Sequence, residues 1–283
     1  MRLGQNARTS YFEAITQTMM KFDAVIFDMD GVVTQTASVH AAAWKDMFDE
    51  YLRRRAHTQG EPFGEFNTVK DYLAFVDGRP RYQGVAAFLK SRGISLPLGT
   101  PLDSSSMETI CGLGNRKNEI FNRIIAANGV AVFPSTLELI TALRSRGIHI
   151  GLATSSKNGD LVLGKAGVRE IFETCVDGLV SAQQGLRGKP EPDIFIWAAA
   201  NLGTTPERAI VVEDAVSGVR AGANGRFALV LGIARENNAA ELAANGADVV
   251  VSDLDEVTVS QLDQWVEAKQ AKLEATAGGA DKR

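Results

Sequence analysis

Residues 24–31 read Ala-Val-Ile-Phe-Asp-Met-Asp-Gly, a short apolar run that ends in two aspartates and a glycine. A continuous apolar run is typical of a strand that is covered on both faces, as strands in parallel sheets are. Asp28 and Asp30 lie two residues apart on an extended segment, so both carboxylates can point to one side. Gly31 then permits a backbone bend that a side chain would resist. The segment therefore predicts a buried strand whose end carries a pair of acids.

Four further apolar runs resemble the first, and helix-length amphipathic segments separate them along the chain. Strands followed by helices in this alternation are typical of βαβ units around a parallel sheet. The sequence thus predicts an α/β fold with a Rossmann-like parallel sheet at its core. The further expected strands are 149–153, 209–212, 228–231 and 247–251, and the helices expected just before the first and second of these four cover 137–143 and 193–202.

The interval from about residue 40 to residue 133 interrupts this alternation, because it contains helical patterns and no comparable buried strand. We expect a helical domain, called the cap below, at 39–133, inserted into a discontinuous core domain at 21–38 and 134–266. Residues 1–20 are an N-terminal extension that could be an ordered helix, a flexible leader or a mis-assigned start. Residues 267–283 are expected to form a frayed C-terminal tail. The helical patterns of the cap cover 40–55, 66–76, 84–92 and 115–128.

Composition excludes several classes of protein. The chain has 283 residues, of which 45% are hydrophobic and 23% charged, enough for one large domain or two smaller ones. The net charge of −4 and the scattered basic residues argue against nucleic-acid binding. Cys111 and Cys175 have neither metal-ligand spacing nor the pattern of a disulfide scaffold. With no apolar run of about 20 residues, we expect a cytoplasmic monomer that does not bind membranes.

Polar clusters follow two other expected strands. Residues 154–158 read Thr-Ser-Ser-Lys-Asn, and Glu213-Asp214 follows the strand after that. In open parallel sheets such clusters gather at the carboxyl ends of the strands. Two acids as close as Asp28 and Asp30 repel each other unless a proton or a cation lies between them. Mg²⁺ suits such a place, because it binds oxygen ligands from carboxylates, phosphate and water.

Two of the clusters could bind an anion. Thr154, Ser155 and the backbone amides that follow are neutral donors at an expected helix start, which is a favourable place for phosphate. Taken alone, a helix N-cap is the simpler interpretation of Thr154. Lys189 lies in Gly-Lys-Pro-Glu-Pro-Asp, residues 188–193, where glycine and prolines indicate a loop of fixed course. A fixed cation there would offset the charge between carboxylates and phosphate, although a surface lysine is the alternative.

The four clusters in this order resemble the haloacid dehalogenase superfamily of aspartate-nucleophile phosphotransferases, over about residues 22–254. The resemblance implies that Asp28 is a nucleophile that forms an aspartyl-phosphate and that Asp30 is the general acid and base. A carboxylate nucleophile divides the transfer into two easier steps, and positioned cations stabilise the charge of the transferring group. The resemblance also implies that Thr154 and Lys189 bind the phosphate. It implies that Mg²⁺ is bound by Asp28, the Asp30 backbone carbonyl, Glu213 and Asp214.

Within that superfamily, the segment from Asp28 onward follows the spacing of the β-phosphoglucomutase subfamily. Residues 78–81 resemble the cap loop whose arginine holds the phosphate that is not transferred, and 116–118 resemble the segment whose lysine faces the sugar. Two departures bear on the sugar accepted: Gln35 replaces a common acid, and the cap is longer. The substrate-binding residues that the resemblance implies are Thr36, His40, Trp44, Arg81, Lys117, Ser155, Ser156 and Asn158.

Each cap residue in that set has a simpler alternative. Arg81 and Lys117 could be solvated helix residues, as most Arg and Lys are. His40 could lie on a helix surface instead of serving a hinge or the site, and Trp44 could pack between cap and core.

The leading hypothesis is Mg²⁺-dependent phosphoryl transfer on a sugar phosphate, converting β-glucose 1-phosphate to glucose 6-phosphate through a bisphosphate. A sugar-phosphate phosphatase would use the same nucleophile and let water attack the aspartyl-phosphate, and the core motifs do not separate the two. A phosphosugar-binding module without turnover is a further alternative, which the intact acids and Lys189 disfavour. Haloacid dehalogenation is also disfavoured, because it needs neither Asp30 nor Mg²⁺.

Overall fold

The computed structural model of the chain describes residues 20–60, 62–235 and 237–280. The predicted N-terminal extension lies outside the described residues, apart from Met20. Throughout these three ranges, no helix has both the length and the apolar character that crossing a bilayer requires.

Among the described residues, six parallel strands form one sheet in the order β3-β2-β1-β4-β5-β6. The central strand β1 pairs Ala24 with His149 on one side and with Ala209 on the other. All five expected strands are present within a residue or two of their predicted bounds, so the predicted α/β fold with a Rossmann-like core is confirmed. The strands are β1 (Ala24–Phe27), β2 (His149–Ala153), β3 (Thr174–Val176), β4 (Ala209–Glu213), β5 (Leu229–Ile233) and β6 (Val249–Val251).

Strand β3 is the one that the sequence did not predict. It has three residues, and it lies at the edge of the sheet, paired only with β2 in the described sheet. Thr174 and Cys175 are half-buried while Val176 is buried. A strand this short and mixed in polarity has no periodicity from which to identify it.

Helices cover both faces of the sheet. Val25 and Phe27 pack in one cluster with α5, α6 and α11, whereas Ala24 and Ile26 pack in another with α8, α9 and α10. Alternate residues of β1 therefore point to opposite faces, and both faces are apolar because both are covered. The helices of this part are α5 (Pro134–Arg144), α6 (Gly159–Ala166), α7 (Gly178–Gln184), α8 (Asp193–Asn201), α9 (Val216–Asn224), α10 (Ala239–Ala244) and α11 (Val259–Ala280), with short turns at Arg169–Ile171, Pro206–Arg208 and Leu254–Glu256.

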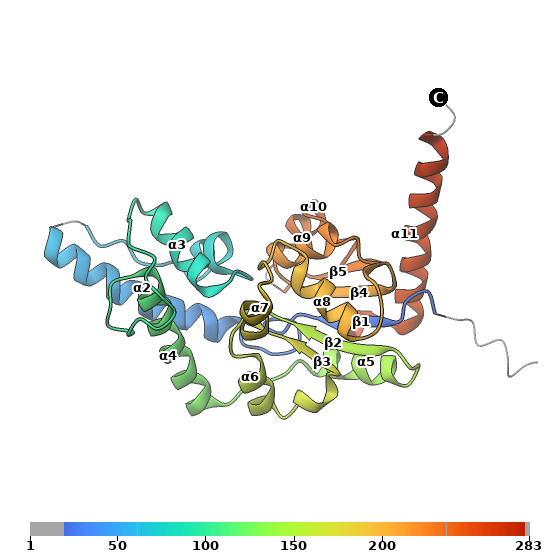
Figure 1. Cartoon of the computed structure of the whole chain (residues 1–283), viewed down its shortest axis with the longest axis horizontal. Coiled ribbons are helices and arrows are strands. Elements are labelled where there is room, and N and C mark those ends of the chain that lie inside the picture. The colour runs from blue at the N-terminus through green and yellow to red at the C-terminus, as the bar shows by residue number, and fades with distance from the viewer. Residues whose placement is uncertain (1–19, 61, 236, 281–283) are drawn as a thin grey trace, which may run out of the picture.

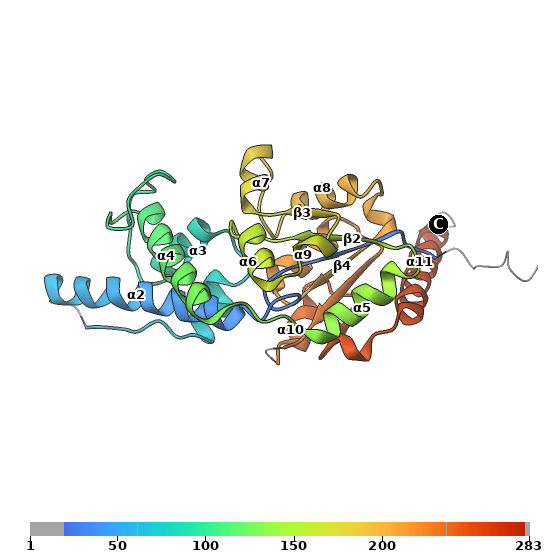
Figure 2. The same cartoon turned by 90° about the horizontal axis from the view of Figure 1, so that it is seen from below.

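The helices α2 (Ala37–Gln59), α3 (Arg81–Ser91) and α4 (Ile110–Asn128) form the opposite end of the molecule from α11, as Figures 1 and 2 show. They share an apolar cluster of their own, which includes Phe48 and Phe88 with ring centroids 4.1 Å apart. Phe121 of α4 instead joins the apolar cluster on the sheet, so α4 contributes to both clusters. The packing thus does not define the boundary between cap and core, and the predicted domain bounds stay a prediction.

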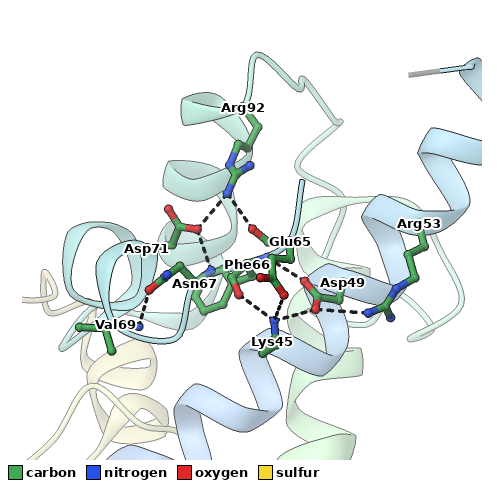
Figure 3. Close-up of polar contacts among 9 residues, drawn as sticks. All are labelled: Lys45, Asp49, Arg53, Glu65, Phe66, Asn67, Val69, Asp71 and Arg92. Atoms are coloured by element: carbon green, nitrogen blue, oxygen red, sulfur yellow. Dashed lines mark hydrogen bonds and ion pairs between the residues drawn. The ribbon is translucent and has the colours of Figure 1, made fainter. Parts of the chain in front are cut away.

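The expected helix over 66–76 is confirmed for residues 70–76 and wrong for residues 66–69, which are not helical. Regular helical structure in this stretch is confined to a π-helical turn at Tyr72–Val76 and the residues directly before it. The preceding chain is irregular because side chains from α2 bind its backbone. The buried carboxylate of Asp49 accepts a hydrogen bond from the Phe66 N–H at 2.8 Å and pairs with Lys45 at 3.0 Å (Figure 3).

The same stretch is held from the side of α3. Arg92 donates to the Glu65 carbonyl at 3.1 Å and to Asp71 at 2.9 Å, and Asp71 accepts from the Asn67 N–H (Figure 3). Backbone donors that a helix would use internally are thus satisfied by acidic side chains. Periodicity alone does not reveal these competing partners.

The chain leaves and re-enters the sheet region at one place. Gln35 N–H donates to Ala131 O at 2.8 Å, and Phe133 N–H donates to Val33 O at 3.0 Å. Two adjacent linkers are what an inserted cap requires, because cap and core can then rotate about a short hinge.

The C-terminal stretch differs from the prediction. The sequence predicts a frayed tail from residue 267, but α11 continues to Ala280. Residues 268–276 are mostly Ala, Lys, Glu and Gln, which have high helix propensity and extend a helix already packed on the core through Leu262 and Val266.

Candidate active site

A cavity of about 70 Å³ lies where the carboxyl ends of β1, β2 and β4 face the cap. It brings together nearly all of the predicted site residues from segments far apart in the chain. Thr36 and Glu213 do not line it but contact residues that do. The predicted residues that line it are Asp28, Asp30, His40, Trp44, Arg81, Lys117, Thr154, Ser155, Ser156, Asn158, Lys189 and Asp214.

Asp28 directly follows β1 and is only 6% exposed. Its N–H donates to Val212 O at 2.9 Å, so the sheet fixes its backbone. The Lys189 ammonium lies 2.5 Å from Asp28 Oδ1 and also contacts Glu213. Burial raises the pKa of Asp28 well above its usual range; Lys189 acts against this shift, and Glu213 adds to it. Lys189 itself is buried, yet Asp28 and Glu213 raise its pKa, so it remains charged. The surface-lysine alternative for Lys189 is therefore wrong.

Asp28, Glu213 and Asp214 form an acidic cluster in which one oxygen from each lies within 4.8 Å of the others. Burial, together with Asp77 and Glu213, raises the pKa of Asp214 well above its usual range. Such crowding of buried carboxylates is costly unless a cation or protons compensate it. One lysine faces three acids here, so the donor set fits a hard divalent cation.

The approach of Asp214 depends on Gly31. A Cβ at Gly31 would lie 1.8 Å from Asp214 Oδ2, and the φ of Gly31 is +84°. Both the space and the backbone conformation therefore require glycine. The bend expected after the acid pair thus brings the ends of β1 and β4 together.

Asp30 faces a different set of partners from Asp28. Its Oδ1 lies 3.2 Å from His40 Nε2 and accepts a hydrogen bond from the Thr36 hydroxyl. Burial acts to raise the pKa of Asp30, but His40 and Thr36 outweigh it, and the net shift is downward. Asp30 is therefore held ionised, the form in which a carboxylate can accept a proton from a nearby hydroxyl.

Lys117 links the cap to Asp30 through His40. Its ammonium contacts His40 Nδ1 and lies 4.8 Å from the centroid of the Phe121 ring. The amino group of Lys117 can donate in either protonation state, and where it donates to Nδ1 the proton of a neutral His40 lies on Nε2, the nitrogen nearer Asp30. Burial and Arg81 lower the pKa of Lys117 well below its usual range, and burial and Lys117 lower that of His40. Lys117 is 3% exposed, so the solvated alternative is wrong for it.

Both interpretations of Trp44, as a residue of the site and as a residue of the apolar packing, agree with the structure. Trp44 lines the cavity, and it is also 4% exposed and packs in the cap cluster, with its ring 5.3 Å from that of Phe48.

The hydroxyl-rich segment after β2, the neighbour of β1 in the sheet, also lines the cavity. Thr154 Oγ1 accepts from the Ser156 N–H at 3.1 Å, and Ser156 Oγ accepts from the Asn158 N–H at 3.2 Å. The following helix, α6, begins only at Gly159, and Thr154 makes no capping bond to it. The simple N-cap interpretation of Thr154 is therefore wrong.

The cap also contacts this segment directly. Ser155 donates through its hydroxyl to Gly78 O at 3.0 Å. A Cβ at Gly78, whose φ is +63°, would lie 2.3 Å from Ser217 Oγ. The loop that contains Gly78 thus inserts between the chain segments after β2 and β4.

Several cavity residues were not in the predicted set. Lys157 falls inside the cluster 154–158 and could have been chosen with its neighbours. Asp77 precedes the loop 78–81; burial and Glu213 raise its pKa to about 7. Tyr72 had no signal, because it lay in a stretch interpreted as a regular helix. The full set of unpredicted lining residues is Tyr72, Val76, Asp77, Gly78, Arg79, Lys157 and Ala215.

A parallel sheet with an acid pair, a buried lysine and a hydroxyl-lined wall at its carboxyl edge defines an α/β enzyme suited to phosphoryl transfer. More particularly, the chain belongs to the haloacid dehalogenase-like hydrolase family, whose model matches residues 22–226. The sequence-based prediction of this superfamily, and of an enzyme, is confirmed.

Individual relatives refine this placement. Over 240 residues the chain is 45% identical to a β-phosphoglucomutase of Mycobacterium bovis, which covers 84% of this chain and 92% of that protein. It is 39% identical over 241 residues to an uncharacterized glycosyl hydrolase of Mycobacterium tuberculosis, covering 85% of this chain and 18% of that longer protein. The crystal structure of a β-phosphoglucomutase from Clostridium difficile matches with a TM-score of 0.69 at 24% identity, over 88% of this chain and 99% of that one, and supports the fold.

Proposed function

We propose that the chain catalyses Mg²⁺-dependent phosphoryl transfer on sugar phosphates through an aspartyl-phosphate at Asp28, as a β-phosphoglucomutase that interconverts β-glucose 1-phosphate and glucose 6-phosphate. The observation that carries the proposal is the union, in one cavity, of the buried Asp28–Lys189 pair with Asp30 and its cap partners His40 and Lys117. The 45% identity to a β-phosphoglucomutase over 92% of its length supports the same reaction.

Asp28 is suited to attack phosphorus. Its carboxylate is fixed by the sheet and by Lys189, so little reorientation precedes the attack. Lys189 and the hydroxyl of Thr154 offer donors to the phosphoryl oxygens, whose negative charge is spread over the group during transfer.

Asp30 would move the protons. When it carries a proton, it can donate that proton to the oxygen that leaves as Asp28 takes the phosphoryl group, and the carboxylate so formed can later deprotonate the hydroxyl that attacks the aspartyl-phosphate. His40, held by Lys117, and Thr36 keep this carboxylate oriented in the meantime.

Asp28, Asp214 and the Asp30 carbonyl, with Glu213 close by, would hold Mg²⁺. The ion, when bound, would offset the negative charge that phosphate meets among these acids. Both oxygens of Glu213 already have partners, Lys189 and the Ala215 N–H. We therefore infer that Glu213 acts on the ion mainly by orienting Lys189 and the chain after β4.

The enclosure of the nucleophile favours a mutase over a phosphatase. Asp28 is 6% exposed, and the cavity beside it is lined both by the strand ends of the core and by residues of α2, α3 and α4. A sugar phosphate bound there would be covered by cap and core together. A closed site protects an aspartyl-phosphate from water until a sugar hydroxyl reaches it.

The proposal also covers the domain organisation, the cellular location and the oligomeric state of the enzyme. We infer a core domain at 21–38 and 134–266 that carries the chemistry, and a cap at 39–133 that contacts the sugar. We further infer a cytoplasmic monomer whose partner is the phosphosugar itself.

The test is a product assay. The protein is incubated with β-glucose 1-phosphate, Mg²⁺ and a trace of glucose bisphosphate, and products are followed by phosphorus NMR. Glucose 6-phosphate is expected, with loss of activity in EDTA and recovery with excess Mg²⁺. Free phosphate as the main product would replace the mutase by a phosphatase. Binding of the sugar phosphate without any transfer would favour the binding module.

A further inference from the structure

We propose that Asn118 is a positioning residue for the phosphate remote from Asp28: it holds Arg81 and Asn158 together through a neutral acceptor, which leaves the charge of Arg81 available to the phosphate. This inference rests on the proposed function, because it requires a phosphosugar in the cavity.

One oxygen atom joins three segments of the chain here. Asn118 Oδ1, on α4, accepts from Arg81 Nη2 at 2.7 Å and from Asn158 Nδ2 at 2.7 Å. Arg81 begins α3, and Asn158 precedes α6 in the core. The bond from Asn158 therefore spans core and cap.

Asn118 acts from behind the cavity wall. Arg81 and Asn158 line the cavity, whereas Asn118 does not. A guanidinium has five N–H donors and a primary amide has two, so each of these residues keeps further donors for a ligand. With one donor of each anchored on the same atom, the remaining donors have fewer orientations, and less conformational entropy is lost when an anion binds.

The charge of the acceptor is the main point. Among the described residues Arg81 forms no ion pair with a carboxylate; its polar partners are Asn118 and Tyr82. Lys117 and Lys157 line the same cavity, and among the described residues neither forms an ion pair with a carboxylate. A neutral amide orients the guanidinium without neutralising it. A carboxylate in the same place would form a charge-assisted pair and compete with phosphate.

The argument predicts opposite effects on stability for two variants that both impair binding. Asn118→Asp keeps the shape and the acceptor and supplies Arg81 with a counter-ion, so the melting temperature should stay or rise. Its Kd for a phosphosugar should increase about tenfold or more. Asn118→Ala leaves two partly buried donors without their acceptor, so both stability and affinity should fall.

Asn128→Asp is the matched control. It introduces the same charge at the exposed last residue of α4, and Asn128 neither lines the cavity nor bonds to Arg81. Its Kd should stay within about twofold of the wild-type value, because a charge without direct contact is weakened by solvent and salt.

The experiment is calorimetric titration of the full chain with glucose 6-phosphate in Mg²⁺, without bisphosphate primer, alongside melting curves and the mutase assay. Weakened binding in a stable Asn118→Asp variant, with KM raised more than kcat is lowered, supports the proposal. Wild-type affinity in Asn118→Asp, or a Kd that follows the melting temperature across all variants, overturns it. If the wild type does not bind glucose 6-phosphate, the proposed function fails first, and this inference falls with it.

Discussion

The two sides of the cavity differ in their balance of charge and are built differently. The core side presents Asp28, Asp30 and Asp214 from the ends of β1 and β4, with Lys189 among them. The cap side presents Arg81 and Lys117 from helices, with His40 between cap and core. Acids at strand ends are fixed by the sheet, whereas the cap cations depend on how helices and loops pack.

This difference separates two tasks. The core side holds the groups that exchange bonds and protons with a phosphoryl group, and the cap side holds cations suited to bind an anion without reacting with it. We therefore expect substitutions on the core side to reduce kcat and substitutions on the cap side to raise KM. Four changes test this comparison, from the largest expected effect on activity to the smallest.

Asp28→Asn should reduce kcat by about 10⁵-fold, because an amide cannot serve as the nucleophile. Steady-state assays of phosphoryl transfer measure this, and titration with glucose 6-phosphate provides the control, since cap-side binding should remain. Substantial residual turnover would remove Asp28 from its role.

Asp30→Asn should lower kcat by about 10²–10⁴-fold, the range typical of general acid and base catalysis. KM should change much less than kcat. Thr36→Val is a useful companion, because it removes the hydroxyl that orients Asp30 but keeps the carboxylate, and it should have a smaller effect. If kcat fell equally in Asp30→Asn and Thr36→Val, the effect of both substitutions would come from a misoriented side chain at position 30, and a role of Asp30 in proton transfer would be contradicted.

Arg81→Ala should lower kcat/KM about tenfold to a hundredfold, mainly through KM, because one buried charged hydrogen-bonding group is lost. Arg81→Lys should recover only part of this, since lysine lacks the planar fork. A loss confined to kcat would contradict the division of tasks between the two sides.

Asp49→Ala should affect stability and leave the chemistry alone. Asp49 is 2% exposed and accepts from the Phe66 N–H, so its removal leaves a buried donor unpaired, at a cost of about 1–3 kcal/mol. Denaturant unfolding measures the loss, and Asp49→Asn, which keeps an acceptor, should lose less. Activity per folded molecule should change less than about twofold; a larger change would show that cap order itself controls the reaction.

The same contrast explains how far the sequence could predict the site. Asp28, Asp30 and Asp214 were predictable because apolar runs mark where strands end, and parallel strands bring their ends together. Lys189 needed the family resemblance, since nothing local predicts that a loop lysine is buried between Asp28 and Glu213.

Cap residues were harder to predict. Tyr72 and Asp77 enter the cavity because the chain before them is irregular, and that course depends on Asp49 and Arg92 binding backbone groups far away in sequence. Asn118 was not predicted, although its neighbour Lys117 was. Its side chain accepts hydrogen bonds from Arg81 and Asn158, which are far away in the sequence and reach it only in the folded chain.

The most direct test of the central claim is to locate the phosphoryl group. The protein is mixed with glucose bisphosphate and Mg²⁺, quenched in acid within milliseconds, digested and analysed by mass spectrometry. The account predicts one phosphoryl group on the peptide that contains Asp28, absent in Asp28→Asn. Phosphorylation of another residue, or transfer between sugars with no phosphorylated peptide at any time, would contradict it.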